Sequence, residues 1–124
     1  MSKYKFIIDK RLMGLNEYTK YNRTNKYVGA EVKKREQQYI IWCIKTQLGN
    51  LKIKKPVIGH FIWVEENKRR DLDNICFAKK FILDALVQSG VLKDDNRRIV
   101  TNFTDGFEYA KKSRVIVELE EVEC

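Results

Sequence analysis

Residues 69–95 constrain this chain most, because they enclose one amphipathic helix between two groups of carboxylates. Asp71 and Asp73 come at the start of the expected helix, and Asp94 and Asp95 follow its end. Clustered carboxylates repel one another and repel phosphates unless a cation joins them. In many phosphoryl-transfer sites that cation is Mg²⁺, held by one or two carboxylates and by phosphate oxygens of the substrate. The segment therefore indicates a metal site within a phosphate-binding surface, which points to a nuclease.

The net charge of +8 favours a polyanionic partner. Residues 1–60 carry 14 Lys and Arg against 4 Asp and Glu, whereas residues 61–124 carry 11 against 13. A basic half joined to a half with an acidic cluster is typical of a nucleic-acid-binding surface with a metal centre set into it. Solvated surface lysines are the plainer interpretation, and composition alone does not decide between the two.

Several protein classes are disfavoured by the sequence. No stretch approaches the roughly 18 apolar residues needed to span a bilayer, and the N-terminal apolar run is too short for a secretory signal. Cys43, Cys76 and Cys124 are odd in number and far apart, without the spacing of a disulfide framework or a zinc site. His60 has no second histidine for a metal site, so a hydrogen-bonded role in the core is expected. These features predict a cytoplasmic protein without a membrane partner.

Hydrophobic periodicity predicts one α/β domain over residues 1–124, in the order β-α-β-α-β-β. The expected strands are 4–8, 57–64, 98–103 and 115–122, and the expected helices are 29–48 and 73 or 74 to about 90. Residues 10–26 are expected to form a long polar loop, and strand 57–64 to be buried on both faces. The first two strands should pair in parallel, and the last two as an antiparallel hairpin around Gly106. The result is a mixed sheet covered by two helices.

The acidic residues can share an ion, although each also has a plainer interpretation. Asp71 and Asp73 are two positions apart, so both side chains point the same way in an extended approach. Asp95 can join them only if the chain after the helix returns toward the helix start. Taken singly, Asp73 is a good helix N-cap, and Asp94 with Asp95 suits a solvated turn.

The motif Arg-Asp-Leu-Asp-Asn at 70–74, followed by Leu-Asp-Ala-Leu at 83–86 and Asp-Asp at 94–95, resembles the signature of RusA-type Holliday junction endonucleases. The resemblance is strongest over residues 69–99. It implies a homodimeric, Mg²⁺-dependent enzyme of DNA recombination and repair that resolves four-way DNA junctions by paired cuts. Carried over by position, Asp71, Asp73 and Asp95 would be the metal-binding catalytic residues, with Asp94 a neighbour of open role.

The resemblance also implies a functional lysine on the helix. The interval from Asp73 to residues 83–86 is about one turn longer than in the bacterial form and resembles phage and prophage forms. Counting back from Asp84 selects Lys80, whereas counting forward from Asp73 selects neither lysine. Lys80 or Lys79 would stabilise negative charge on the phosphate, with Lys80 preferred for this role and Lys79 for binding DNA. Lys80 also lies four residues before Asp84, so an ion pair within the helix is its plainer interpretation.

Basic residues outside the acidic cluster are expected to bind the DNA backbone. Arg69 and Arg70 offer guanidinium donors for phosphates next to Asp71. The expected basic loop would follow the DNA arms with Arg11, Lys20, Arg23 and Lys26, while Tyr18, Tyr21 and Tyr27 either stack on bases or pack onto the core. Two other functions stay open: a nuclease for flaps or forks, and a non-catalytic DNA-binding module.

Overall fold

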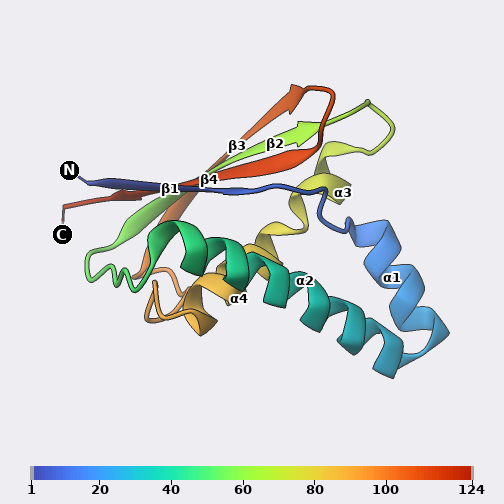
Figure 1. The fold of residues 1–124 in the computed structure, drawn as a ribbon, viewed down its shortest axis with the longest axis horizontal. Helices are drawn as coiled ribbons and strands as arrows, with labels where there is room; N and C mark the ends of the chain where they lie inside the picture. Colours follow the sequence, from blue (N-terminus) through green and yellow to red (C-terminus); the bar gives the residue numbers. More distant parts are fainter. Residues whose placement is uncertain (1, 124) are drawn as a thin grey trace.

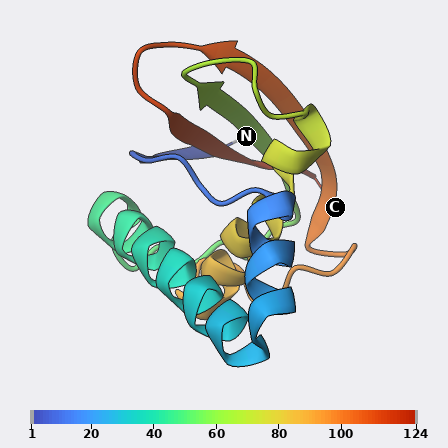
Figure 2. The same cartoon turned by 90° about the vertical axis from the view of Figure 1, so that its right-hand side faces the viewer.

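The computed structural model describes residues 2–123 as a four-stranded sheet with helices on one face (Figure 1). The strands are β1 (Lys3–Ile8), β2 (Val57–Glu65), β3 (Val100–Tyr109) and β4 (Arg114–Glu121). The helices are α1 (Leu15–Thr24), α2 (Lys26–Leu48), α3 (Leu72–Cys76) and α4 (Lys79–Gln88). The turned view in Figure 2 shows the sheet as one layer and the helices as the other. The predicted α/β class with a mixed sheet is confirmed.

The strand order is β1-β4-β2-β3, and it corrects the predicted pairing twice. β4 lies between β1 and β2 and is antiparallel to both, so β1 and β2 are not the parallel pair. The parallel pair is β2 and β3, joined through α3 and α4. β2 therefore separates β3 from β4, and Gly106 lies inside β3 opposite Ile62 instead of in a hairpin turn.

Burial explains this order. The inward side chains of β4 alternate along the strand and are almost wholly buried, as a central strand requires: Val115, Val117 and Leu119. In β3, residues 101–105 are exposed, which suits the edge of the sheet. The alternation of apolar residues predicts that β3 and β4 are strands. Which strands they pair with depends on how much of each strand is buried in the assembled sheet.

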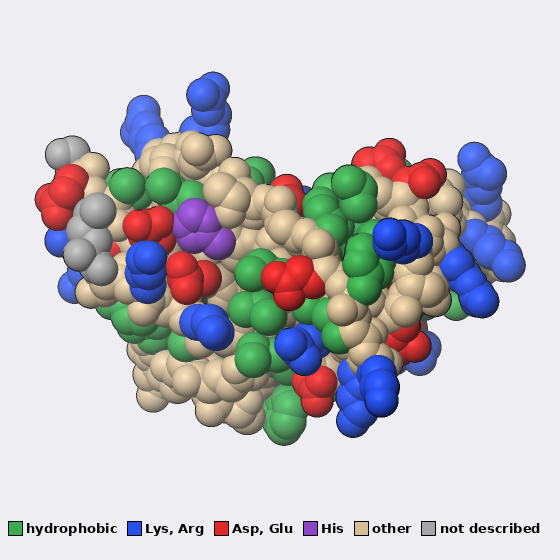
Figure 3. All heavy atoms as spheres, turned by 90° about the horizontal axis from the view of Figure 1, so that it is seen from above, with side chains coloured by type: hydrophobic (Ala, Val, Ile, Leu, Met, Phe, Trp, Pro, Cys, Tyr) green, Lys and Arg blue, Asp and Glu red, His purple; other side chains and the backbone are tan. Residues whose placement is uncertain are grey.

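β2 is a central strand as predicted, but only one of its faces is fully buried. Phe61 and Trp63 point into the core, whereas His60 and Ile62 are half-buried on the face without helices. Figure 3 looks onto this open face, where the single histidine is visible. His60 Nδ1 lies 2.6 Å from the Thr104 hydroxyl and Nε2 lies 2.8 Å from the Glu120 carboxylate. The predicted hydrogen bonds of His60 are present, but its ring lies half-buried on the open face of the sheet and not in the core. The hydrogen bond from His60 lowers the pKa of Glu120.

The prediction of a long loop over residues 10–26 was wrong, because α1 occupies most of it. The backbone N–H of Gly14 donates to Glu17 at 3.4 Å, which closes the start of α1. The Asn25 side chain accepts from the Tyr27 N–H at 2.7 Å and starts α2 three residues earlier than expected. Every residue of α1 is at least partly exposed, so α1 lacks the buried stripe by which helices are recognised in sequence.

The single predicted helix after Asp73 is two helices. α3 ends at Cys76, and α4 begins at Lys79 after a turn at residues 77 and 78. The predicted stop near Gly90 is confirmed, since Gly90 has a φ of 84°, a left-handed conformation that favours glycine. Tyr18 of α1 packs against Phe77 of this turn, with ring centroids 5.6 Å apart. Packing onto the core is therefore the observed role of Tyr18, whereas Tyr21 and Tyr27 are exposed.

Cys43 is buried and Cys76 half-buried, and both are free thiols; Cys124 lies outside the described residues. Burial raises the pKa of both thiols. Within residues 2–123, no helix is long and apolar enough to cross a membrane.

The Gln47 side chain of α2 hydrogen-bonds the outer edge of β1. Its Oε1 accepts from the Ile7 N–H and its Nε2 donates to the Ile7 carbonyl, each at 2.7 Å. β1 is an edge strand, so these backbone groups of Ile7 point away from β4. The Gln47 carboxamide thus makes the two hydrogen bonds that a residue of an adjacent strand would make with Ile7.

Replacing Gln47 with Ala removes both hydrogen bonds. We expect the free energy of unfolding to fall by about 1 kcal/mol and the Ile7 amide to exchange faster with solvent. Urea denaturation and hydrogen exchange measure these two effects. Gln38→Ala, on an exposed position of the same helix, is the matched control. Equal stability and equal exchange for the two variants would contradict the role given to Gln47.

Candidate functional site

Asp71 and Asp73 lie at the start of α3, shortly after β2 ends, and both are exposed. Asp71 occupies the N-cap position with extended backbone, but within the described residues its carboxylate makes no capping hydrogen bond. Asp73 lies inside the first turn, where one carboxylate oxygen accepts from the Asn74 N–H at 3.0 Å. Asp73 is therefore not the helix cap that its position in the sequence favours. Both carboxylates remain accessible to a solvent-borne ion.

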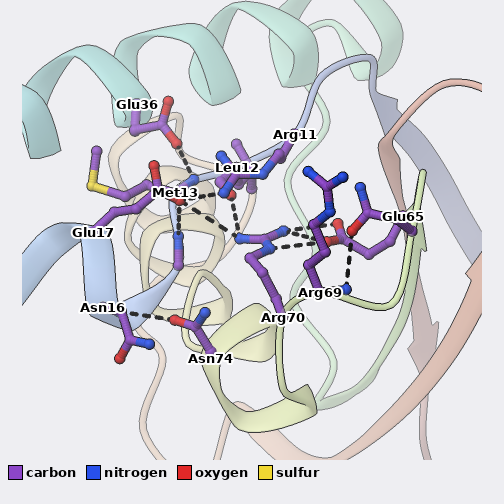
Figure 4. A network of polar contacts seen from close by, with 12 residues as sticks. Arg11, Leu12, Met13, Asn16, Glu17, Glu36, Glu65, Arg69, Arg70 and Asn74 are labelled. Atoms are coloured by element: carbon purple, nitrogen blue, oxygen red, sulfur yellow. Dashed lines mark hydrogen bonds and ion pairs between the residues drawn. The ribbon is translucent and has the colours of Figure 1, made fainter.

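Arg70 anchors this segment to the rest of the molecule (Figure 4). Its Nε and Nη2 donate to the two oxygens of Glu65 at 2.9 and 2.8 Å, and its Nη1 donates to the Leu12 carbonyl at 3.1 Å. The Arg70 and Glu65 side chains are only 12% and 10% exposed. The structure thus places Arg70, expected to bind phosphate, in a buried bidentate ion pair.

Two further contacts hold the chain around the start of α1, one to α3 and one to α2. The Asn74 side chain accepts from the Asn16 N–H at 2.9 Å, and the buried Glu36 of α2 accepts from the Met13 N–H at 2.8 Å (Figure 4). A Cβ on Gly14 would lie 2.6 Å from the Asn74 Oδ1, so the close approach of the two segments requires glycine. The position of the two aspartates is therefore set by three elements distant in sequence.

Arg69 and Arg11 are exposed and border a pocket of about 210 Å³ beside the Arg70 pair. Glu65, Glu66, Asn67, Arg70 and Ser113 complete its lining. Arg11 also pairs with Glu17. Burial opposes ionisation of Glu17, but the hydrogen bond and charge of Arg11 outweigh it and lower the pKa of Glu17. Arg69 is therefore the more available of the two guanidinium groups for a phosphate.

The chain after α4 turns back, so that Asp95 lies beside Lys80 in the first turn of α4. The sequence alone did not show whether the chain turns back in this way. The Lys80 ammonium lies 3.7 Å from Asp95 and 3.2 Å from Asp84. The expected ion pair between Lys80 and Asp84 is thus present, and the hydrogen bond to Asp84 raises the pKa of Lys80, with a smaller contribution from Asp95. Lys80 remains 60% exposed. Asp94 accepts from the Asp95 N–H and from Asn96, as in a solvated turn.

Lys79 points into a different cluster, which sequence reasoning missed. Its ammonium lies 2.7 Å from Asp105 of β3 and 4.4 Å from the centre of the Phe103 ring. The Trp63 indole N–H donates to the other Asp105 oxygen at 2.9 Å. Lys79 is only 15% exposed, so this ion pair fastens α4 to β2 and β3. Lys79 and Lys80, adjacent in sequence, thus face different carboxylates.

The donor atoms fit a Mg²⁺ ion in part. Asp71 and Asp73 offer accessible carboxylate oxygens, and Mg²⁺ is commonly held by one or two carboxylates with water and phosphate oxygens. Among residues 2–123, no three acidic, histidine or cysteine side chains are grouped so that they could hold a metal. Asp95 lies beside Lys80 and is not assembled with Asp71 and Asp73 into one site.

Of the four basic residues expected to contact DNA arms, Lys20, Arg23 and Lys26 lie on helices, whereas Arg11 lies in the chain between β1 and α1. Lys20 and Arg23 line an open groove of about 490 Å³ along α1, with Leu15, Asn16, Thr19 and Thr24. Lys26 begins α2 and is exposed, with its ammonium 5.5 Å from the centre of the Tyr27 ring. This basic end of the molecule includes Tyr21 and Tyr27, both of which are exposed.

The model of a protein family described as endodeoxyribonuclease RusA matches residues 14–120 of the 124 residues. No curated protein matches the chain. The matched range includes the four helices, β2, β3, Asp95 and all but the last residue of β4.

Replacing Arg70 with Ala leaves the buried Glu65 carboxylate without its partner. Breaking a buried pair is strongly destabilising, so we expect the free energy of unfolding to fall by about 3 kcal/mol in urea denaturation. Arg69→Ala is the matched control, because Arg69 is exposed and its loss should leave stability nearly unchanged. If both variants unfold at the same urea concentration, Arg70 does not have the anchoring role that its contacts indicate.

Proposed function

Because this chain belongs to the endodeoxyribonuclease RusA family, we propose that it resolves four-way DNA junctions by Mg²⁺-dependent cleavage in recombination and repair. The family match over residues 14–120 is the observation that carries the proposal. The exposed carboxylates at the start of α3 agree with it, since they lie between basic groups of α1 and α4. A reducing cytoplasm suits its free thiols Cys43 and Cys76.

We propose that Asp71, Asp73 and Asp95 hold the metal ion. Asp71 and Asp73 fit this role by their exposure and their spacing at one helix start. Asp95 would join them with the DNA phosphate in place. When bound, Mg²⁺ polarises the scissile phosphodiester and activates a water molecule for in-line attack.

The cationic side chains would then hold and neutralise the phosphates. Lys80 is the catalytic lysine in this proposal, because its exposed ammonium lies beside Asp95 and can donate to a phosphate oxygen as negative charge develops there. Arg69 would bind a neighbouring phosphate. Arg11, Lys20, Arg23 and Lys26 would follow the DNA arms, and Arg70 would act by holding α3 in place. Lys79 would contact DNA only in exchange for its pair with Asp105.

We also propose a homodimer, because two symmetric cuts require two active sites related by a two-fold axis. Ile40, Cys43 and Ile44 of α2 are in the core, so the apolar surface available in this part of the helix includes that of Trp42, 60% exposed, and the half-buried Tyr39. Light scattering at micromolar concentration should give twice the 14.8 kDa mass of one chain. A mass of 14.8 kDa would count against the dimer.

One assay distinguishes junction resolution from the two alternatives, a flap or fork nuclease and a non-catalytic DNA-binding module. The protein is incubated with labelled four-way, flap and linear DNA, with and without Mg²⁺. Paired cuts in the four-way DNA alone support junction resolution. Preferred cleavage of flaps would identify a flap nuclease, and salt-sensitive binding without any cleavage would identify a non-catalytic DNA-binding module.

We expect Asp71→Asn and Asp73→Asn each to abolish cleavage of a four-way junction while binding survives. Either change removes a metal ligand and also a negative charge that faces DNA, so binding is kept or becomes tighter. Cleavage rates in Mg²⁺ and gel-shift affinities in EDTA measure the two effects. Asp94→Asn is the control, because Asp94 belongs to a solvated turn. Normal cleavage by both Asp71 and Asp73 variants would remove the catalytic assignment.

Lys80→Ala should lower the cleavage rate by roughly tenfold or more with junction affinity nearly kept, because it removes charge stabilisation at the phosphate. Lys79→Ala should mainly weaken binding and should also lower the melting temperature, since it leaves Asp105 unpaired. Single-turnover rates, binding curves and thermal melts distinguish the two variants. A large rate effect confined to Lys79→Ala would show that Lys79 and not Lys80 is the functional lysine.

A further inference from the structure

A second basic surface lies at the other end of the molecule from α1. Lys54, Lys55 and Lys93 line a groove of about 480 Å³, together with Ile53 and Ile99. All three lysines are exposed, and the groove lining contains no acidic side chain within the described residues. The salt bridges of residues 2–123 do not include these lysines. The groove therefore concentrates three uncompensated positive charges in one concave surface.

The two loops that form this groove are fastened to each other and to the core. The Ile53 N–H donates to the Val91 carbonyl at 2.9 Å, and the Val57 N–H donates to the Ile99 carbonyl at 2.8 Å. Ile53 and Val91 are also buried. Because the backbone is held by these bonds, the spacing of the three lysine stems is set before any ligand arrives.

The groove also has a defined place relative to the candidate site. Lys93 is two residues before Asp95, which contacts Lys80 on α4. Figure 1 shows the loops of residues 49–56 and 89–99 at one end of the molecule and α1 at the other, with α3 between them. Basic surfaces thus lie on both sides of Asp71 and Asp73.

We propose that this groove binds the phosphodiester backbone of a DNA arm, separate from the arm that α1 contacts. The inference rests on the proposed junction-resolving function and adds the path of a second arm to it. Charge complementarity selects this ligand, because three closely spaced lysines match the repeated charges of a nucleic-acid backbone. A four-way junction sends its arms in different directions from the cut site, so a protein that holds it needs basic surfaces on more than one side.

The test is the triple variant Lys54→Ala, Lys55→Ala, Lys93→Ala, measured for binding to a labelled four-way junction in EDTA over a range of salt concentrations. Each phosphate contact contributes about 0.9 to the slope of log affinity against log salt, so we expect the slope to fall by about 2 to 3. At moderate salt the affinity should fall by roughly tenfold or more. The matched control removes the same charge from Lys5, Lys34 and Lys45, which are exposed on β1 and α2.

A second measurement does not depend on substitution. Acetylation of the wild-type lysines is compared with and without bound junction, and Lys54, Lys55 and Lys93 should be protected while Lys5 is not. If wild-type protein binds and cuts junctions but the triple variant keeps its affinity and salt slope, the groove is not a DNA contact and the proposed function stands. If wild-type protein does not bind four-way DNA at all, the proposed function and the groove assignment both fail.

Discussion

The buried pair between Arg70 and Glu65 is the interaction on which the rest of the candidate site depends. Glu65 is the last residue of β2, and the same guanidinium also holds the Leu12 carbonyl ahead of α1. One side chain therefore joins the end of a central strand, the chain leading to α1 and the chain leading to α3. Burying two charges is tolerated only when their geometry is good and their remaining hydrogen bonds are satisfied, so the pair leaves this corner few alternative arrangements.

Elements with strong local patterns were predictable from sequence, whereas their neighbours in the sheet were not. The alternation in β2 and β4 and the apolar stripe of α2 indicated real elements within a few residues of their bounds. α1 carried no such stripe, and its start depends on Gly14 and Glu17, a weak signal in a polar stretch. The order of the strands depends on long-range burial, which no window of the sequence contains.

Some residues of the candidate site were likewise predictable from the sequence, whereas others were not. The spacing of Asp71 and Asp73 was enough to place both on one accessible helix start. Arg69 and Arg70 look alike in sequence, and only the position of Glu65 reveals that one is buried and the other exposed. No residue near Asp105 in the sequence indicates its role, because its partners are Trp63 of β2 and Lys79 of α4. Recognising it requires the register of the parallel pair, which places Asp105 opposite Phe61 and within reach of Trp63.

The two borders of the sheet are chemically unlike. On the β1 side, the Gln47 carboxamide satisfies the outward peptide groups of Ile7 and blocks the approach of another chain. On the β3 side, alternate peptide groups of a ten-residue strand point into solvent, and within the described chain the Asn102 side chain caps one of them, the Phe103 N–H. Extension of this sheet by a foreign strand, whether from a peptide or from a misfolded copy, is therefore open at β3 and obstructed at β1.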